Sequence, residues 1–307
     1  MLRSLSVTAA LLAFCGLLLV SESDRLGASL LLRGGVVPPV GCVDAVPAPA
    51  AAWGLTKETF CDNFTSASTI DTTDSKLAGF KWYIHNTWPS SSSNYGWTTL
   101  PPTTLAEFSV SSGLTMQPAS ATPGAGTAIE EFNTCVTNAS SGYIGTTFKP
   151  PFYIDVTATW AYGTSGPPSW TTAQWWPIAW TEPAPLFTLG NSGSLNYTEF
   201  DLFEGPYGKS AHFWSWANNE GGVIATQNSQ NFASGVPIGT LVIPTTMNSG
   251  TGLVKGYNNE VADASLNFTY TTSGNFSDID NEQNCILLSG GHGWPMTITS
   301  IKIFQLP

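Results

Sequence analysis

Charged side chains are scarce in this chain of 307 residues. Lys and Arg number 10, Asp and Glu number 21, and the formal net charge at pH 7 is −11. Nucleic-acid binding needs a basic footprint, so this balance argues against a nucleic-acid partner and equally against an anionic membrane surface. Hydrophobic residues still make up 42% of the chain, so the low charge does not indicate disorder. An acidic, weakly charged chain suits a neutral partner such as an uncharged glycan.

Cysteine is also sparse, and no two cysteines form a C-x-x-C pair, which argues against a zinc site. After Cys15 the chain has only Cys42, Cys61, Cys135 and Cys285. In an exported protein these four can form two disulfides with three possible connectivities. We favour Cys61 with Cys285, because terminal strands often neighbour one another in β-sandwiches.

Long apolar runs are missing except at the N-terminus. Arg3 is followed by an apolar run from Leu5 to Val20 and a polar stretch at 21–24, a pattern typical of a secretory signal peptide. An uncleaved membrane anchor is the alternative. We therefore expect a secreted or cell-surface protein, acting as a monomer, with no other membrane partner.

Helical periodicity is absent beyond the leader, and residues 56–62 favour at most a short helical turn. Pro- and Ala-rich sequence at 24–52 favours an extended linker. Strand patterns are frequent and are separated by clusters of Gly, Pro, Asn and Ser. They lie at residues 79–84, 152–160, 241–243, 264–270 and 298–304. We predict an all-β jelly-roll sandwich of two antiparallel sheets.

One candidate strand carries three acidic residues. Glu199 and Asp201 are two positions apart and share one face, and one bulged residue at Leu202 or Phe203 would bring Glu204 to the same face. Like charges gathered on one face are costly in a purely structural strand. Retaining glycosidases need two such carboxyls, one as nucleophile and one as acid/base.

The alternative for this segment is a solvent-exposed edge strand whose acidic residues have no catalytic role. Bulky Phe200, Leu202 and Phe203 between the acids favour instead a half-buried strand, with Phe200 and one of the other two in the core.

The segment resembles the E-x-D-x-x-E signature of glycoside hydrolase family 16, the laminarinase and lichenase group, in its bulged form. That family has a concanavalin A-like jelly roll whose concave sheet forms the glycan cleft. The resemblance implies that Glu199 is the nucleophile, Asp201 assists it, and Glu204 is the acid/base. It also implies a structural calcium on the convex face, which no feature of this sequence locates, so the metal site is unknown. The chemistry itself requires no cofactor.

Other segments extend the resemblance over roughly Phe60 to Gln305. Residues 176–180, Trp-Pro-Ile-Ala-Trp, resemble the family's W-P-A-x-W segment, and His212-Phe213-Trp214 resembles its H-x-W strand. Core packing is the alternative for the tryptophans, above all for Trp180, and a structural role is the alternative for His212. The residues that the resemblance places at the substrate are Trp175, Trp176, Trp180, His212 and Trp214.

Two family features are missing. The strand at 151–157 has no Arg or Lys where the family often has one, and residues 218–259 lack the usual F-H-x-Y-x-x-x-W segment. These departures leave the preferred substrate open.

The expected organisation is a signal peptide or anchor at 1–23, a linker at 24–52 and a family 16-like catalytic domain at 53–307. The expected function is an endo-acting, retaining glycoside hydrolase whose partner is a polysaccharide, a β-1,3 or β-1,3-1,4 glucan. A non-catalytic concanavalin A-like glycan-binding protein of the cell surface is the alternative. A polysaccharide lyase is a third reading, but its Tyr or His base with a neighbouring Arg has no matching cluster here.

Overall fold

The structure is a computed structural model. Its described residues belong to one compact unit spanning 36–307. For β11, β12 and β13, and for all of β10 except Ala179 and Thr181, the description covers the backbone path and strand pairing only. The described residues are 42, 45–84, 108–116, 131–138, 142–160, 177–183, 197–204, 210–217, 220–228, 234–246, 251–271, 283–289 and 296–307.

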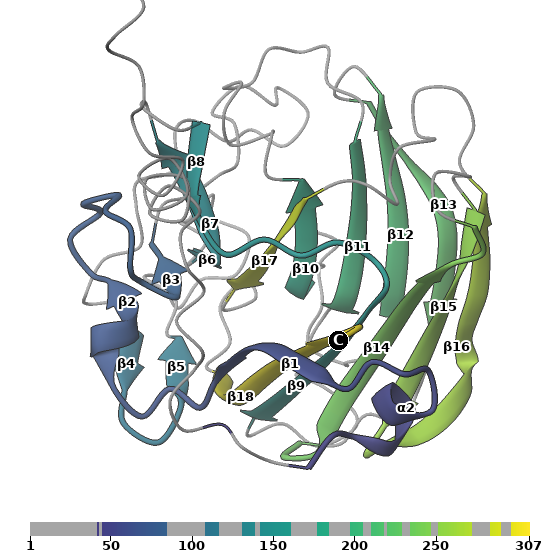
Figure 1. Cartoon of the computed structure of the whole chain (residues 1–307), viewed down its shortest axis with the longest axis horizontal. Coiled ribbons are helices and arrows are strands. Elements are labelled where there is room, and N and C mark those ends of the chain that lie inside the picture. Colours follow the sequence, from purple (N-terminus) through teal and green to yellow (C-terminus); the bar gives the residue numbers. More distant parts are fainter. Residues whose placement is uncertain are drawn as a thin grey trace, which may run out of the picture. The chain divides into compact units, whose positions relative to one another are not determined.

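Two eight-stranded sheets make up most of the described chain (Figure 1). Their neighbouring strands are antiparallel, apart from the parallel pair β2–β3. Sheet A runs in the order β16 (Val261–Thr271), β15 (Thr251–Asn258), β14 (Pro237–Pro244), β9 (Phe152–Trp160), β18 (Met296–Gln305), β5 (Leu114–Met116) and β4 (Phe108–Val110), with β1 (Lys57–Asp62) also paired to β18. Sheet B runs in the order β13 (Glu220–Asn228), β12 (Ser210–Ala217), β11 (Tyr197–Glu204), β10 (Pro177–Pro183), β17 (Asn284–Ser289), β6 (Glu131–Asn133), β3 (Trp82–Tyr83) and β2 (Ile70–Asp71).

The core lies between the inner faces of these sheets. Alternate residues of β9 and β18 supply it from sheet A, and Ala179, Ile286 and Leu288 supply it from sheet B. This alternation confirms the predicted jelly-roll sandwich of two antiparallel sheets. The strands predicted at 152–160, 241–243, 264–270 and 298–304 lie within β9, β14, β16 and β18, whereas the strand predicted at 79–84 is reduced to the two residues of β3.

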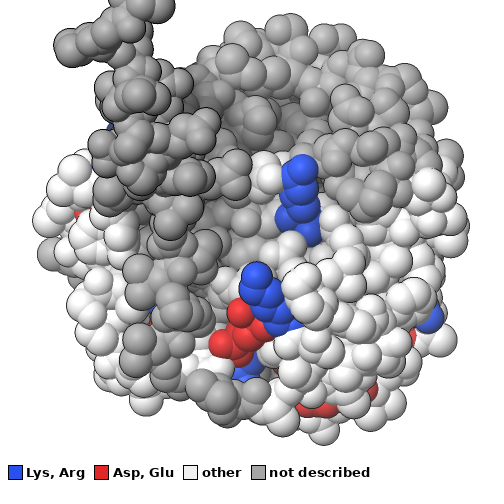
Figure 2. Space-filling model, viewed as in Figure 1, with Lys and Arg blue, Asp and Glu red and all other residues white. Residues whose placement is uncertain are grey.

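Three further elements complete the described chain. They are the two-stranded ribbon β7 (Cys135–Asn138) and β8 (Gly142–Gly145), the helical turn α2 (Ala48–Ala51) and the 3₁₀ turn η1 (Ala67–Thr69). No helix within the described ranges has the length and apolar character needed to cross a membrane. On the face that Figure 2 shows, few of the described residues are charged.

The N-terminal part of the unit differs from the sequence prediction. Residues 57–62 form β1, paired with β18, and the helical turn lies earlier, at Ala48–Ala51. Pro49 in the first turn accepts this start, because its missing N–H would be unpaired there anyway. The extended conformation predicted for this Pro/Ala-rich stretch is therefore wrong at α2. The apolar residues of this stretch pack on the outer side of sheet A against Tyr153, Leu241, Tyr257 and Phe304.

The disulfide pairing also differs from the prediction. Cys42 is bonded to Cys61, and Cys135 to Cys285, so the favoured Cys61–Cys285 pair is wrong. Cys61 lies on β1, which adjoins β18 of sheet A, whereas Cys285 lies on β17 of sheet B. The terminal strand that neighbours β1 is thus β18, and each cysteine finds its partner beside its own sheet.

Candidate active site

Strand β11 carries the predicted acidic residues in the interior of sheet B, between β10 and β12. Glu199 pairs with Trp214, Asp201 with His212, and Glu204 with Ser210. Three residue steps of β11, from 201 to 204, therefore lie opposite two steps of β12, from 212 to 210. One extra residue in β11 is a β-bulge, at the place where the sequence predicted one.

The bulge changes the phase of the strand. Positions 199, 201 and 204 pair with alternate residues of β12, namely 214, 212 and 210. Because alternate residues of a strand share one face, the ladder assigns the three acidic positions the same phase of the pleat. The described pairing therefore agrees with the phase that the acidic signature requires.

The described residues of β10 and β17 show on which face of sheet B the acidic positions lie. Position 203 pairs with Ala179, which pairs with Leu288, and both of these residues belong to the core between the sheets. Position 201 pairs with Trp180, which pairs with Leu287, a buried residue outside that core cluster. By register, position 201 belongs to the outer face of sheet B, the face turned away from sheet A.

The aromatic positions fall around this strand only in part. Trp180, His212 and Trp214 lie on β10 and β12, directly across from Asp201 or Glu199. Trp175 and Trp176 lie outside the described residues. The catalytic and substrate-binding roles of all these side chains stay predictions.

On the outer face of sheet B, a row of paired residues continues from β10 across β17, β6, β3 and β2. Leu287 pairs with Asn133, Asn133 with Tyr83, and Tyr83 with Asp71. Each has at most 1% of its surface exposed, so this side of the outer face is covered. The sequence did not predict this row of buried residues. The strands β2, β3 and β6 are too short to show the alternation of apolar and polar residues that indicates a strand.

The electrostatics of the row do not suit proton transfer near neutral pH. Burial, and then the carboxylate of Asp71, raise the pKa of Tyr83 to about 12. The Tyr83 hydroxyl donates a hydrogen bond to the carbonyl oxygen of Leu77 at 3.2 Å. A lyase would need a Tyr that loses its proton readily, and Tyr83 does not meet that need.

Asp71 has a structural role in the turn that follows β2. Its carboxylate accepts hydrogen bonds from Ser75 Oγ at 2.9 Å and from the Lys76 amide at 2.8 Å. Burial alone would raise the pKa of Asp71, but these bonds, with one from Thr73, lower it below 3.8. Within the described ranges no three His, Cys, Asp or Glu residues lie together as a metal would require, and the structural calcium implied by the resemblance stays a prediction.

Comparison with known proteins found similar folds among solved structures. No protein-family model matches the chain. No curated protein matches it either. Similar solved structures include the GlcNAcα1-4Gal-releasing endo-β-galactosidase from Clostridium perfringens, at 13% identity and a TM-score of 0.46 over 81% of this chain and 62% of that one. The chain thus spans less than two thirds of that enzyme.

Two further solved structures cover nearly all of their own chains. An endo-1,3-β-glucanase from Streptomyces sioyaensis is 15% identical with a TM-score of 0.45, over 81% of this chain and 96% of that chain. Rv0315 of Mycobacterium tuberculosis, described as an immunostimulatory antigen and pseudo β-1,3-glucanase, is 13% identical with a TM-score of 0.41, over 81% and 98%. At this distance the likenesses carry no conclusion about activity.

Proposed function

We propose that this protein is a retaining glycoside hydrolase that cleaves a β-linked glucan with β-1,3 or β-1,3-1,4 bonds. The observation that supports this most is the one-residue bulge of β11, which puts positions 199, 201 and 204 in one phase of the ladder. The register also assigns position 201 to the outer face of sheet B, where a polysaccharide could reach it. A strand with no chemical task has no reason to gather three carboxylates there.

The proposed reaction has two steps. Glu204, protonated, donates its proton to the glycosidic oxygen while the carboxylate of Glu199 attacks the anomeric carbon, so that the leaving sugar departs and a glycosyl ester forms. Water then attacks the ester with Glu204 as base, which frees Glu199 and regenerates the acid. Asp201 lies between the two and assists by hydrogen bonding to the nucleophile. Its negative charge also favours a bound proton on a neighbouring carboxyl.

Glu199→Gln tests this assignment directly. We expect the variant to lose at least about 10³-fold in kcat while unfolding at the same denaturant concentration as the wild type, because the amide cannot act as nucleophile. Reducing-sugar release from laminarin, lichenan, xyloglucan, agarose and carrageenan would measure it and identify the substrate. Glu260→Gln is the matched control, since Glu260 is exposed on the β15–β16 turn of sheet A.

Two outcomes would change the conclusion. A Glu199→Gln variant with wild-type activity would remove Glu199 as nucleophile. No release from any glycan by the wild type, with binding to one of them retained, would favour the non-catalytic glycan-binding protein. The anomer first released, followed by NMR, should be the β-anomer if the mechanism retains configuration.

A further inference from the structure

The outer face of sheet B is closed on one side of the candidate active site. In β17, Ile286 and Leu288 belong to the core between the sheets, so Cys285 and Leu287, which alternate with them, belong to the outer face. Neither Cys285 nor Leu287 has any exposed surface. Other parts of the chain therefore cover the outer face at β17. Only β10 lies between β17 and β11 in the sheet.

Part of this cover is the β7–β8 hairpin. The chain leaves sheet B after β6 at Thr134, whose amide donates to the carbonyl oxygen of Ile286 at 3.0 Å. Cys135, the next residue, is bonded to Cys285. The hairpin is therefore tied to the outer-face side of β17 by a covalent bond at its base.

The far strand of the hairpin lies against β3. Gly145 at the end of β8 has φ +102°, and a Cβ there would collide with the carbonyl oxygen of Thr134 and press on the ring of Tyr83. Such a close approach needs glycine. The next residue, Thr146, donates its amide to the Thr134 oxygen at 2.7 Å. The hairpin thus covers the outer face at Cys285 of β17 and at Tyr83 of β3.

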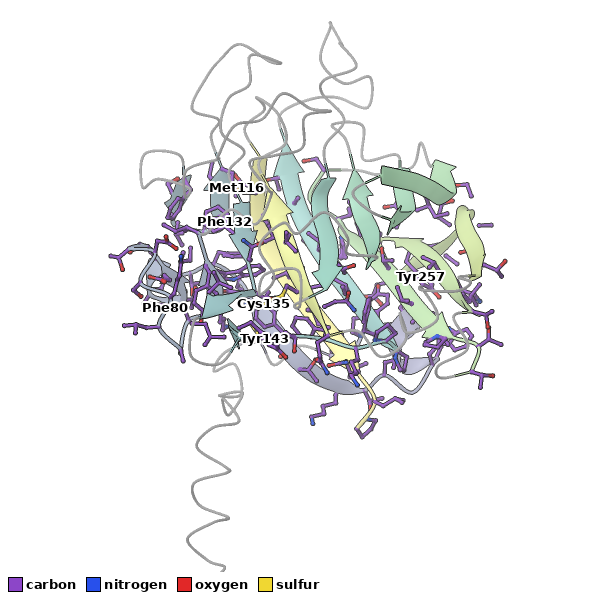
Figure 3. All side chains as sticks on the ribbon, turned by 90° about the horizontal axis from the view of Figure 1, so that it is seen from above. Phe80, Met116, Phe132, Cys135, Tyr143 and Tyr257 are labelled. Carbon is purple, nitrogen blue, oxygen red and sulfur yellow. A yellow bond between two sulfur atoms is a disulfide. The ribbon has the colours of Figure 1, made fainter. Side chains whose placement is uncertain are left out.

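The views of the molecule agree with this placement. Figure 1 shows β7 and β8 beside β6 and β3, with β10 to β13 following toward the other side. In Figure 3, Phe80, Phe132, Cys135 and Tyr143 gather on one side of the molecule, far from Tyr257.

The arrangement of the acids sets the direction of a bound glycan. Glu199 and Glu204 are separated along β11, and in a retaining glycosidase the two carboxyls flank the scissile bond. A chain that passes between them must cross the strands of sheet B. It then runs toward β13 on one side and toward β17 on the other.

We propose that the β7–β8 hairpin ends the glycan cleft at β17 and so directs cleavage to a position near one end of the glucan chain. This rests on the proposed glycosidase function. Strands lie about 4.8 Å apart, so β17 is about 10 Å from β11 and leaves room for about two sugar units on that side. The internal cleavage implied by the family resemblance would need both sides open.

The wild-type protein alone can test the proposal. A series of β-glucan oligosaccharides of increasing length, labelled at the reducing end, would be digested to low conversion, and the cut positions would be read by mass spectrometry. We expect cuts about two units from one end at every chain length. Cuts that move toward the middle as the chain grows would overturn the proposal and leave the hydrolase assignment intact. No cleavage of any glycan would overturn both.

Variants test the role of the hairpin itself. In C135S/C285S the hairpin loses its covalent tie, and we expect the share of internal cuts to rise roughly tenfold, since even one methylene that a pocket excludes changes discrimination by about tenfold or more. C42S/C61S is the matched control, because it removes the disulfide beside sheet A and should keep the wild-type pattern. The same change in both variants, or none in the first, would overturn the proposal. If C135S/C285S fails to fold, the wild-type cut positions decide.

Discussion

Asp155 is the buried acid whose environment has the clearest energetic consequence. It lies on β9 with 7% of its surface exposed, and its Oδ1 has no hydrogen-bond partner. Burial raises the pKa of Asp155 to about 7, Lys302 on β18 lowers it, and Glu260 beyond β15 raises it. Tyr153, on the same face of β9, is also buried with a hydroxyl that lacks a partner. The carboxyl is therefore held in its neutral form in the folded protein at mildly acidic pH.

This predicts a pH dependence of stability with a definite sign. Because the folded pKa of about 7 lies above the ordinary value of 3.8, the folded state binds more protons between them. The free energy of unfolding from this group is largest below about pH 4, falls as the pH rises to about 7, and is constant above, a loss of up to about 4 kcal/mol. Asp155→Asn should remove this slope. Denaturant unfolding of both proteins at several pH values measures it, and equal slopes would contradict the prediction.

At the scale of elements, the loop between β2 and β3 depends on one side chain. The Asp71 carboxylate binds the Ser75 hydroxyl and the Lys76 amide, and Asp74 and Lys76 have positive φ values of 49° and 53°. These backbone conformations are uncommon for side chains other than Asn, Asp and Gly. The loop therefore keeps its path because the buried carboxylate fixes it.

Asp71→Ala should destabilise the protein by about 2 to 3 kcal/mol, because the Lys76 amide and Ser75 hydroxyl lose a charged acceptor. Asp71→Asn keeps one acceptor oxygen and should cost less. Since the pKa of Asp71 is lowered, its contribution is present above pH 4 and is lost as the pH falls further. Urea denaturation at pH 7 and pH 3 measures both variants. A wild-type midpoint for Asp71→Ala would show that the loop does not need the carboxylate.

For the whole molecule, the two disulfides close loops of very different length. Cys135 and Cys285 are 150 residues apart, and Cys42 and Cys61 are 19 apart. In the chain-entropy model, the longer loop contributes about 5 kcal/mol and the shorter about 3. We expect C135S/C285S to unfold at a lower temperature than C42S/C61S in calorimetry. The reverse order would mean that the hairpin tie contributes less than the N-terminal tie.

The sequence predicted the jelly roll because long strands such as β9 and β18 alternate between core and surface over many residues. It also predicted the bulge of β11, because the spacing of the three acids requires an extra residue there. The disulfide pairing could not be derived, since it depends on which strands become neighbours across the fold. The β7–β8 hairpin was missed for a related reason: its two strands have four residues each, and the ribbon exists because β17 holds its base.

The pairing of β1 with β18 brings the first and last strands of the sandwich together. Lys57 lies opposite Gln305, and the side chain of Leu306 is within reach of Gly54. Once the residues before β1 are removed, α2 and Cys42 among them, a short peptide could join the end of β18 to the start of β1 without breaking a strand pair. The same sheets could then form although the strands follow one another in a different order along the chain. A circularly permuted chain with new ends in an exposed turn, such as that between β15 and β16 at Asn259–Glu260, should assemble the same two sheets.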